Sequence, residues 1–287
     1  MLRLTSLFQS LTAHFTGQFC KNVALPVSRE QWKHHSSNAM GLSTDKILGA
    51  VTAKVREISP AVVGKYLDIG AGHGDLIRLL SREFTLEPTA CDYTTELMRV
   101  PGMSVDVVDL NIDLLPYRDA SFDLITCTEV IEHVEHYRHT FREIFRILKP
   151  GGTFVLTTPN ILNLRSRIRY LLFGFFSLFG PLHLRESRRY LTGGHINPVS
   201  YFYVAHALSD AGFADISVSI DKRQRGSVVW YLLLWIPIRL FSLWAIHREK
   251  HRYKTIDEIN QRFVREMNSA DLLLGRTIVV GCRKKSS

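Results

Sequence analysis

The sequence predicts a doubly wound α/β fold, in which a parallel sheet carries helices on both of its faces. Strand-like and helix-like runs alternate from about residue 60 to the C-terminus, and a glycine-rich turn joins the first strand to the first helix. Two long apolar stretches interrupt this alternation, so the fold is expected to carry insertions.

Seven segments are short apolar runs bounded by turn residues, a pattern typical of buried strands. They are residues 64–70, 85–92, 103–110, 121–128, 152–159, 214–222 and 276–285. Helical patterns cover residues 75–84, 129–149 and 199–212. The helix over 129–149 is expected to end at Pro150, because proline lacks an amide hydrogen and the glycines after it permit a turn. Gly212 is expected to cap the helix over 199–212.

The composition is that of a globular chain, with 46% hydrophobic and 22% charged residues among 287, which excludes disorder and collagen-like repeats. The 36 basic residues exceed the 27 acidic ones by 9, so an anionic partner is favoured: a phospholipid surface, nucleic acid or a phosphorylated substrate. The four cysteines form no Cys-x-x-Cys pair, which is typical of thiols in a reducing compartment.

The chain divides into an N-terminal extension over residues 1–45 and one domain over residues 46–287. The extension holds no acid before Glu30, and its apolar residues recur at near-helical spacing. Two interpretations stay open. The segment is either a helix packed on the domain or a mitochondrial targeting peptide, because such peptides are amphipathic and poor in acids.

The sharpest motif is LDIGAGHGDL, residues 67–76, at the end of the first strand. Glycines at such a turn let a ligand approach bare backbone. Asp92 ends the next strand 20 residues after Gly72, where a carboxylate can accept both hydroxyls of a ribose. Asp68 and Asp109 add further acids. The array suits an adenosine without phosphates, because the acids would repel a pyrophosphate.

A second motif, EVIEHVEH, follows the fourth strand. If it is helical, Glu129, Glu132, His133 and His136 share one face, at positions i, i+3, i+4 and i+7. A carboxylate and an imidazole one turn apart can bind a divalent ion or form an acid–base pair.

The runs LDIGAGHG, CDYT, VVDLN, FDLITCTEVIEHV and LKPGGTFVLTTPN, in this order over residues 60–160, resemble the class I S-adenosylmethionine-dependent methyltransferases. Within that class the chain resembles the ubiquinone-biosynthesis O-methyltransferases and the type 11 and type 23 methyltransferase groups. The resemblance implies a Rossmann-like sheet of seven strands, mostly parallel with the last strand antiparallel. It also implies S-adenosylmethionine as the cofactor.

The resemblance places nine residues at the cofactor: Asp68, Gly70, Gly72, Gly74, Asp92, Tyr93, Asp109, Leu110 and Thr128. The glycines would pass under the methionine and ribose, and Asp92 would bind the ribose hydroxyls. Asp68 would hold the loop and reach the amino group. Tyr93 would pack against the adenine, and Thr128 would lie near the methionine.

The chain also resembles the small-RNA 3′-end 2′-O-methyltransferases, in which two glutamates and a histidine join a later histidine to hold magnesium. Glu129, Glu132 and His133 match the first three, and His195 is the expected fourth ligand. The alternative is catalysis without a metal, with His133 and Glu129 handling the acceptor's proton. A long apolar insertion distinguishes this chain from the RNA enzymes.

The insertions, residues 161–198 and 226–272, are expected to form a cap or a membrane-facing surface. Residues 228–246 hold one charge, Arg239, and one proline, Pro237. A membrane span would need a second apolar run for the chain to return, so a bent, in-plane or re-entrant segment is favoured. Three tryptophans and the basic run at 247–254 suit an anionic membrane surface. The alternative is a lid or a dimer face in a soluble protein.

We therefore expect methyl transfer from S-adenosylmethionine to an oxygen of a lipid-like, prenylated or lipid-linked acceptor. The enzyme would lie on the cytoplasmic side of an inner membrane, or in a mitochondrion. Two alternatives remain: a small-RNA 2′-O-methyltransferase, and a catalytically silent membrane protein that binds the cofactor. The sequence leaves the oligomeric state open.

Overall fold

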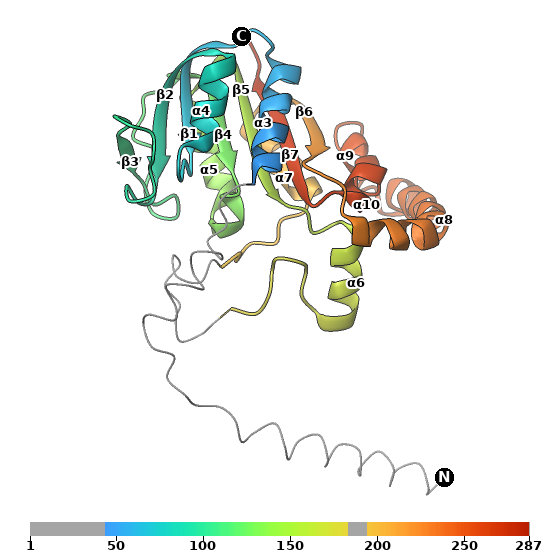
Figure 1. The fold of residues 1–287 in the computed structure, drawn as a ribbon. Helices are drawn as coiled ribbons and strands as arrows, with labels where there is room; N and C mark the ends of the chain where they lie inside the picture. The colour runs from blue at the N-terminus through green and yellow to red at the C-terminus, as the bar shows by residue number, and fades with distance from the viewer. Residues whose placement is uncertain (1–43, 183–193, 287) are drawn as a thin grey trace, which may run out of the picture. The chain divides into compact units, whose positions relative to one another are not determined.

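The structure is a computed structural model that describes residues 44–182 and 194–286 (Figure 1). Its centre is a seven-stranded sheet of order β3-β2-β1-β4-β5-β7-β6. The strands are β1 (Val63–Ile69), β2 (Thr85–Asp92), β3 (Val105–Val107), β4 (Phe122–Thr128), β5 (Leu148–Pro159), β6 (Phe213–Ile220) and β7 (Thr277–Lys284). Strand β7 runs antiparallel between β5 and β6, and the pairings among β1 to β5 are parallel. The predicted mostly parallel, doubly wound sheet is confirmed.

The chain reverses its direction of winding between β1 and β4. It moves outward from β1 through β2 to β3, and then returns to place β4 on the other side of β1. At such a switch point the connections leave a crevice at the carboxyl ends of the strands, where ligands of α/β proteins bind. The sheet order therefore positions the site before any side chain is considered.

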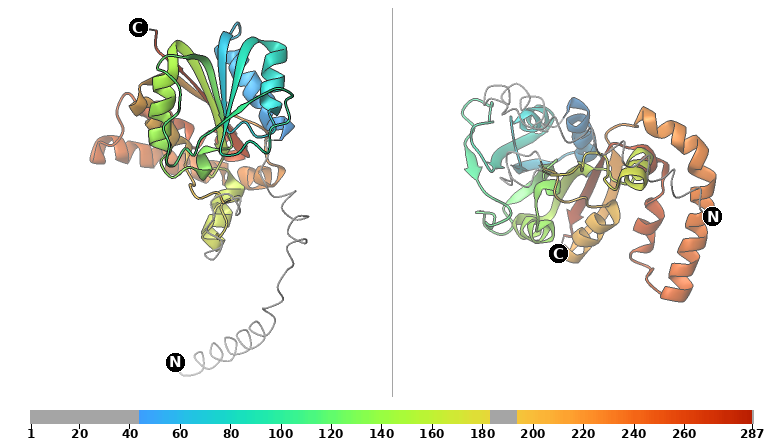
Figure 2. Two further views of the ribbon diagram at one scale, coloured as in Figure 1. Left: turned by 90° about the vertical axis from the view of Figure 1, so that its left-hand side faces the viewer. Right: turned by 90° about the horizontal axis from the view of Figure 1, so that it is seen from below.

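Helices cover both faces of the sheet, as Figure 2 shows. The long helices against the sheet are α3 (Asp45–Ile58), α4 (Asp75–Glu83), α5 (Tyr137–Ile147) and α7 (Tyr201–Ala211). Successive residues of a strand point to opposite faces, so each buried strand supplies two cores. On β5, Val155 packs with α3 and α4, whereas its neighbours Phe154 and Leu156 pack with α5 and α7.

The predicted helix over 129–149 is wrong at its start. The chain forms a single 3-10 turn, η1 (Ile131–His133), then extends through Val134, and α5 begins only at Tyr137. Glu129 adopts a left-handed φ of 54°, which an α-helix does not accept. Val130, Ile131 and Val134 have the spacing of a helix, and all three pack into the core. Side chains at this spacing can be buried without a continuous helix.

Two further boundaries differ from prediction. Pro150 lies within β5, because α5 already ends at Ile147 and Leu148 pairs with Phe122 of β4. β3 covers only three residues of the predicted 103–110. The cap at Gly212 is confirmed, with the left-handed φ of 104° that glycine accepts.

The insertions contribute α6 (Leu164–Phe173), α8 (Arg225–Arg248), a π-helical turn η2 (Glu249–Tyr253), α9 (Gln261–Glu266) and α10 (Ala270–Leu274). Helix α8 continues through Pro237, and Figure 2 (right) shows it bending along its length. Helix α6 lies against α8. Among the described residues, one helix, over Arg225–Tyr253, is long and apolar enough to cross a membrane. The interpretations of residues 1–43 and 183–193 lie outside the described residues.

Candidate active site

The glycine loop joins β1 to α4 at the carboxyl edge of the sheet. Gly70, Gly72 and Gly74 have φ values of 73°, 51° and 76°, which favour glycine. A Cβ on Gly70 would lie 2.2 Å from Cγ2 of Val130, so the loop has no room for a side chain there. The amides of Gly70 and Ala71 donate to the carbonyl of Cys91 in β2, at 2.8 and 3.2 Å. The loop is therefore held against the end of β2.

Asp92 is the side chain that links this loop to β2. Its carboxylate accepts the amide of Gly72 at 2.8 Å and the amide of Tyr93 at 2.7 Å. Burial raises the pKa of Asp92, although these amides oppose the shift. A carboxylate has about four acceptor positions. The amide of Thr94 also interacts with this carboxylate. The acceptor capacity that the three amides leave suits a ribose hydroxyl.

Asp68 faces inward rather than into the crevice. The Thr126 hydroxyl donates to it at 2.6 Å, and that hydroxyl lies 2.7 Å from the Tyr66 hydroxyl. Burial raises the pKa of Asp68 to about 7. The structure thus ties Asp68 to the base of the loop, and its contact with an amino group stays a prediction.

This raised pKa predicts a pH-dependent stability. Between about pH 4 and pH 7 the folded protein holds a proton on Asp68 that the unfolded chain releases, so the free energy of unfolding should fall as pH rises through this range. Asp68→Asn removes the titration and should flatten this part of the curve. Urea unfolding of both proteins over a pH series measures the difference, and parallel curves would contradict the assignment.

The other predicted cofactor residues surround the same crevice. Tyr93 is 43% exposed beside Asp92. Asp109 follows β3, and its carboxylate accepts the amide of Asn111 at 2.9 Å. Thr128 ends β4, and its buried hydroxyl has no hydrogen-bond partner among the described residues. A buried hydroxyl without a partner is costly, so this atom is available to a ligand.

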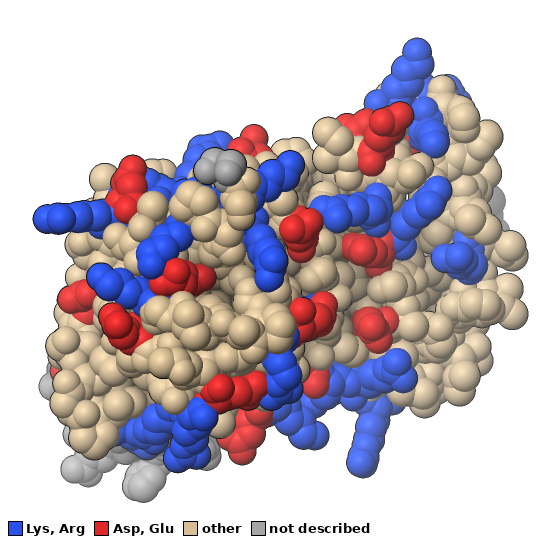
Figure 3. Space-filling model, turned by 90° about the horizontal axis from the view of Figure 1, so that it is seen from above, with Lys and Arg blue, Asp and Glu red and all other residues tan. Residues whose placement is uncertain are grey.

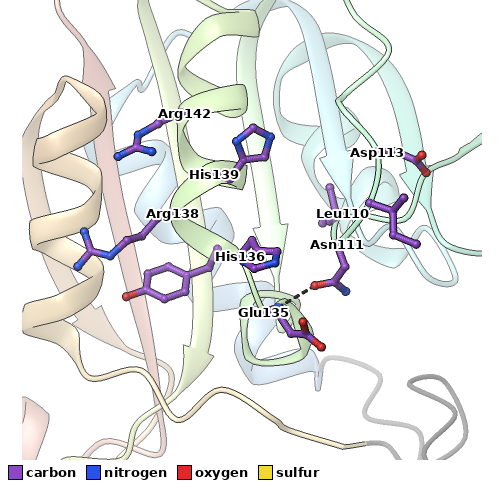
Figure 4. A pocket seen from close by; sticks show the side chains of 10 residues that line it. Leu110, Asn111, Asp113, Glu135, His136, Arg138, His139 and Arg142 are labelled. Carbon is purple, nitrogen blue, oxygen red and sulfur yellow. Dashed lines mark hydrogen bonds between the residues drawn. The ribbon is translucent and has the colours of Figure 1, made fainter.

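Leu110 lines a cavity of about 380 Å³ between the loop after β3 and the start of α5. Figure 4 shows His136 and His139 pointing toward Leu110 and Asn111 across this cavity. The Asn111 carboxamide accepts the amide of Glu135 at 2.7 Å, which joins the two walls. His136 therefore belongs to this cavity and does not share a helical face with His133.

The two glutamates of the EVIEHV motif lie on opposite faces of the sheet. The Thr157 hydroxyl donates to Glu129 at 3.0 Å, and the Thr158 hydroxyl donates to Glu132 at 3.1 Å. Consecutive residues of a strand point to opposite faces, so the two glutamates accept hydrogen bonds from opposite faces of β5, although Glu129 is close enough to raise the pKa of Glu132. The expected common face is therefore wrong. Burial raises the pKa of Glu129 to about 7 and raises that of Glu132 as well.

His133 has a defined tautomer. Its Nδ1 lies 3.1 Å from the carbonyl oxygen of Gly194, so Nδ1 carries the hydrogen and Nε2 keeps a free lone pair. Burial lowers the pKa of His133, which favours the neutral ring. A neutral imidazole with a free Nε2 is suited to accept a proton or bind a metal.

His195 joins His133 because the chain after residue 193 is fastened to η1. The amides of Ile196 and Asn197 both donate to the carbonyl of Glu132, at 2.9 and 3.0 Å. The two imidazole rings lie 4.9 Å apart, centroid to centroid. Burial lowers the pKa of His195 to about 4.

Three of the four predicted metal ligands come together. Glu132, His133 and His195 each offer a ligand atom, and these atoms all lie within 4.8 Å of one another. Glu132 Oε1 and His195 Nδ1 are buried and have no hydrogen-bond partner among the described residues. The structure does not bring Glu129 into this cluster. Unpartnered polar atoms facing one another fit either a metal ion or the polar atoms of a substrate.

Thr157, Thr158 and Gly194 were not among the site residues predicted from the sequence. The threonines stand in the TTPN run, but a single sequence does not reveal which hydroxyl meets which acid. The role of Gly194 depends on its carbonyl, which every residue type carries.

Gly70→Ala is expected to destabilise the protein by about 2 kcal/mol or more, because φ is positive and Val130 occupies the space of the new Cβ. Gly49→Ala is the matched control: Gly49 lies inside α3 with nothing within 4 Å of the new Cβ. It should stabilise the protein by about 0.5–1 kcal/mol. Urea unfolding measures both changes, and equal effects would contradict the geometry of the loop.

These features fit S-adenosylmethionine. The glycine loop is held at the carboxyl ends of β1 and β2 by the carbonyl of Cys91 and the carboxylate of Asp92. The buried Thr128 hydroxyl beside it has no hydrogen-bond partner among the described residues. The fold and the site define the class: the protein is a class I S-adenosylmethionine-dependent methyltransferase. Residues 45–218 match the family model described as a methyltransferase domain, and the chain belongs to that family.

Curated relatives carry the same kind of name. A ubiquinone/menaquinone biosynthesis C-methyltransferase of Desulfotalea psychrophila is 28% identical over 168 residues, which cover 53% of this chain and 67% of that protein. A ubiquinone biosynthesis O-methyltransferase of Xanthomonas oryzae pv. oryzae is 36% identical over 104 residues, covering 33% of this chain and 43% of that protein. The match thus spans less than half of this second relative.

A solved S-adenosylmethionine-dependent methyltransferase from Archaeoglobus fulgidus has the same fold, with a TM-score of 0.52 and 15% identity. The superposition covers 88% of this chain and 99% of that one.

Proposed function

We propose that the protein methylates an oxygen of a lipid-like, prenylated or lipid-linked acceptor at a membrane surface. One observation carries this proposal: the apolar segment after α6 contacts the histidine cluster. The buried ring of Phe179, from the segment after α6, lies 5.2 Å from the ring of His195. An acceptor that reaches His133 therefore has an apolar wall beside it.

The residues divide the work as follows. Gly70, Gly72, Gly74 and Asp92 would hold S-adenosylmethionine, with Thr128 at its methionine end. The bound cofactor supplies an electrophilic methyl group. His133 would accept the proton of the acceptor hydroxyl at its Nε2, while the Gly194 carbonyl holds the ring through Nδ1. Alignment of the acceptor supplies much of the remaining rate enhancement.

The names of the relatives support an acceptor of this kind. One relative is named for O-methylation and another for C-methylation in quinone biosynthesis. For this chain we favour an oxygen acceptor, because a neutral imidazole is suited to an acidic hydroxyl. We place the enzyme on the cytoplasmic face of an inner membrane, with a mitochondrial location as the alternative.

A metal-dependent reaction is the second candidate. The convergence of Glu132, His133 and His195 supports it. Two imidazoles and one carboxylate fit zinc or iron better than magnesium, which prefers oxygen ligands. A small-RNA acceptor goes with this candidate, and Glu129 would then act through Thr157 rather than as a ligand.

Incubation with methyl-labelled S-adenosylmethionine and host extract, with and without chelator, tests these candidates. Label in the organic phase that resists chelator supports the lipid-like acceptor and His133 as the base. Label in RNA that chelator abolishes supports the metal reaction instead. Bound cofactor with no label in any fraction would identify a silent binding protein and overturn the proposal.

A further inference from the structure

We infer that α8 lies flat in the interface of an anionic lipid bilayer, as an in-plane anchor that does not cross the membrane. This inference specifies how the membrane surface of the proposed function is contacted. It stands on the geometry of α8 and holds whichever acceptor is methylated.

Only a narrow stripe of α8 is covered by protein. From Ser227 to Ser242 the buried and half-buried side chains recur three or four residues apart: Ser227, Tyr231, Leu234, Ile238 and Ser242. Every residue between them is exposed. Eleven of the exposed residues of α8 are large and apolar: Val228, Val229, Trp230, Leu232, Leu233, Trp235, Ile236, Leu240, Phe241, Leu243 and Trp244. So large an apolar surface is typical of a membrane or protein contact.

The covered stripe shows why α8 does not cross a bilayer. The chain that returns from α8 packs along it: α10 contacts α8, and the Asn268 carboxamide donates to the Ser242 hydroxyl at 2.7 Å. Residues 255–274 hold six charged side chains: Asp257, Glu258, Arg262, Arg265, Glu266 and Asp271. A spanning α8 would carry part of this segment into the hydrocarbon, where each charge costs about 2.5–3.5 kcal/mol or more.

Both ends of the excursion are also fixed to the same sheet. The amide of Gln224, before α8, donates to the carbonyl of Leu274 at 2.7 Å, and Arg223 pairs with Gly275. Figure 1 shows α8 near the level of the carboxyl edge of the sheet, and Figure 2 (right) shows its length from below. A helix in the membrane plane keeps the charged returning segment out of the hydrocarbon and both of its ends beside the sheet. A spanning helix does not.

Helix α6 extends the same surface next to the site. The amide of Arg165 lies 3.4 Å from the Ser227 hydroxyl, which joins the two helices. At the far end of α6, Leu171 and Leu172 are 78% and 79% exposed. Figure 3 shows the molecule from above, where Lys and Arg are interspersed with Asp and Glu over the part that holds the sheet, as expected of a surface in water.

Charge identifies the bilayer as anionic. The apolar helix ends in HREKHRYK, residues 247–254, which holds four basic side chains and one acid. The Arg248 guanidinium lies 5.1 Å from the ring of Trp244, so cation and aromatic ring stand together where the apolar surface ends. This arrangement is typical of helices that lie among anionic headgroups.

Vesicle flotation tests the contact, with phosphatidylcholine alone and phosphatidylcholine mixed with phosphatidylglycerol. The full chain should float with the mixed vesicles. The double variant Leu232→Asp, Leu240→Asp should reduce partitioning about 100-fold. The matched control Val63→Asp, at an exposed valine in β1, should float like the wild type. Lys250→Gln with Arg252→Gln should weaken binding to the mixed vesicles about 30-fold.

The depth of the tryptophans in the bilayer distinguishes an in-plane helix from a spanning one. In variants that keep a single tryptophan, Trp235 or Trp244, lipids brominated near the headgroup should quench both equally well. Stronger quenching of Trp235 by bromines at the bilayer centre would overturn the in-plane geometry. Failure of the wild type to float, with self-association that the double variant abolishes, would assign the surface to a second copy of the chain.

Cofactor binding distinguishes this inference from the proposed function. The double variant should bind S-adenosylmethionine like the wild type, because Leu232 and Leu240 lie outside the site. Lost flotation with retained cofactor affinity supports the anchor even if no lipid product is found.

Discussion

Asp92→Ala is expected to abolish measurable binding of S-adenosylmethionine, with a loss of affinity of about 100-fold or more. The substitution removes the carboxylate that is proposed to bind the ribose, and it also releases the Gly72 amide, which Asp92 holds at 2.8 Å. Loss of one charge-assisted hydrogen bond costs about 1.5–3 kcal/mol, and several are lost together. Isothermal titration calorimetry measures the change directly.

Two variants separate the cofactor role from loop stability. Asp92→Asn keeps one oxygen acceptor for the loop, so it should fold like the wild type and still bind weakly. Asp106→Asn is the control: this exposed carboxylate on β3 accepts the Tyr117 hydroxyl and lies outside the proposed cofactor contacts. Unchanged affinity in Asp92→Ala would refute the ribose assignment.

His133→Ala is expected to lower kcat by about 10²–10⁴-fold and to leave the affinity for S-adenosylmethionine nearly unchanged. The neutral ring presents its Nε2 lone pair because the Gly194 carbonyl holds Nδ1–H. Burial lowers the pKa of His133 from 6.5, and protonation removes the base, so the wild-type kcat should fall only at pH below that value. A pH–rate profile with labelled cofactor measures both effects.

His206→Ala is the matched control, because His206 is exposed on α7 and belongs neither to the cluster nor to the cavity that Leu110 lines. It should keep most of the activity. Full activity of His133→Ala would exclude His133 from the mechanism. Loss of activity in both His133→Ala and His195→Ala, together with loss of bound metal by elemental analysis, would favour the metal-dependent reaction.

The parts of the site that were predictable are local in sequence. The glycine loop needs φ values that glycine favours. The pattern of a strand, Gly-x-Gly-x-Gly and a helix predicts such a loop from about ten neighbouring residues. Asp92 was predictable because a carboxyl end of a neighbouring parallel strand must lie near that loop. The family resemblance implied seven strands, mostly parallel with the last antiparallel, whereas their order came from the structure.

The geometry of the EVIEHV motif was not predictable in this way. Its apolar residues have helical spacing, yet the left-handed Glu129 and the extended Val134 interrupt the helix on both sides of η1. The sequence placed Glu129 and Glu132 on one face. The alternation of Thr157 and Thr158 on β5 places them on opposite faces.

By itself, the sequence determined the α/β class, the glycine loop, the acid that follows it and the presence of apolar insertions, because each depends on residues near one another in the chain. The tertiary structure alone decided which polar groups meet. His195 lies beside Glu132 and His133 because hydrogen bonds join its chain neighbours to residues more than 60 positions earlier in the sequence. The tertiary structure also decided that the charged segment after α8 packs along one side of that helix. The hydropathy of α8 gives no information about the segments that pack against it.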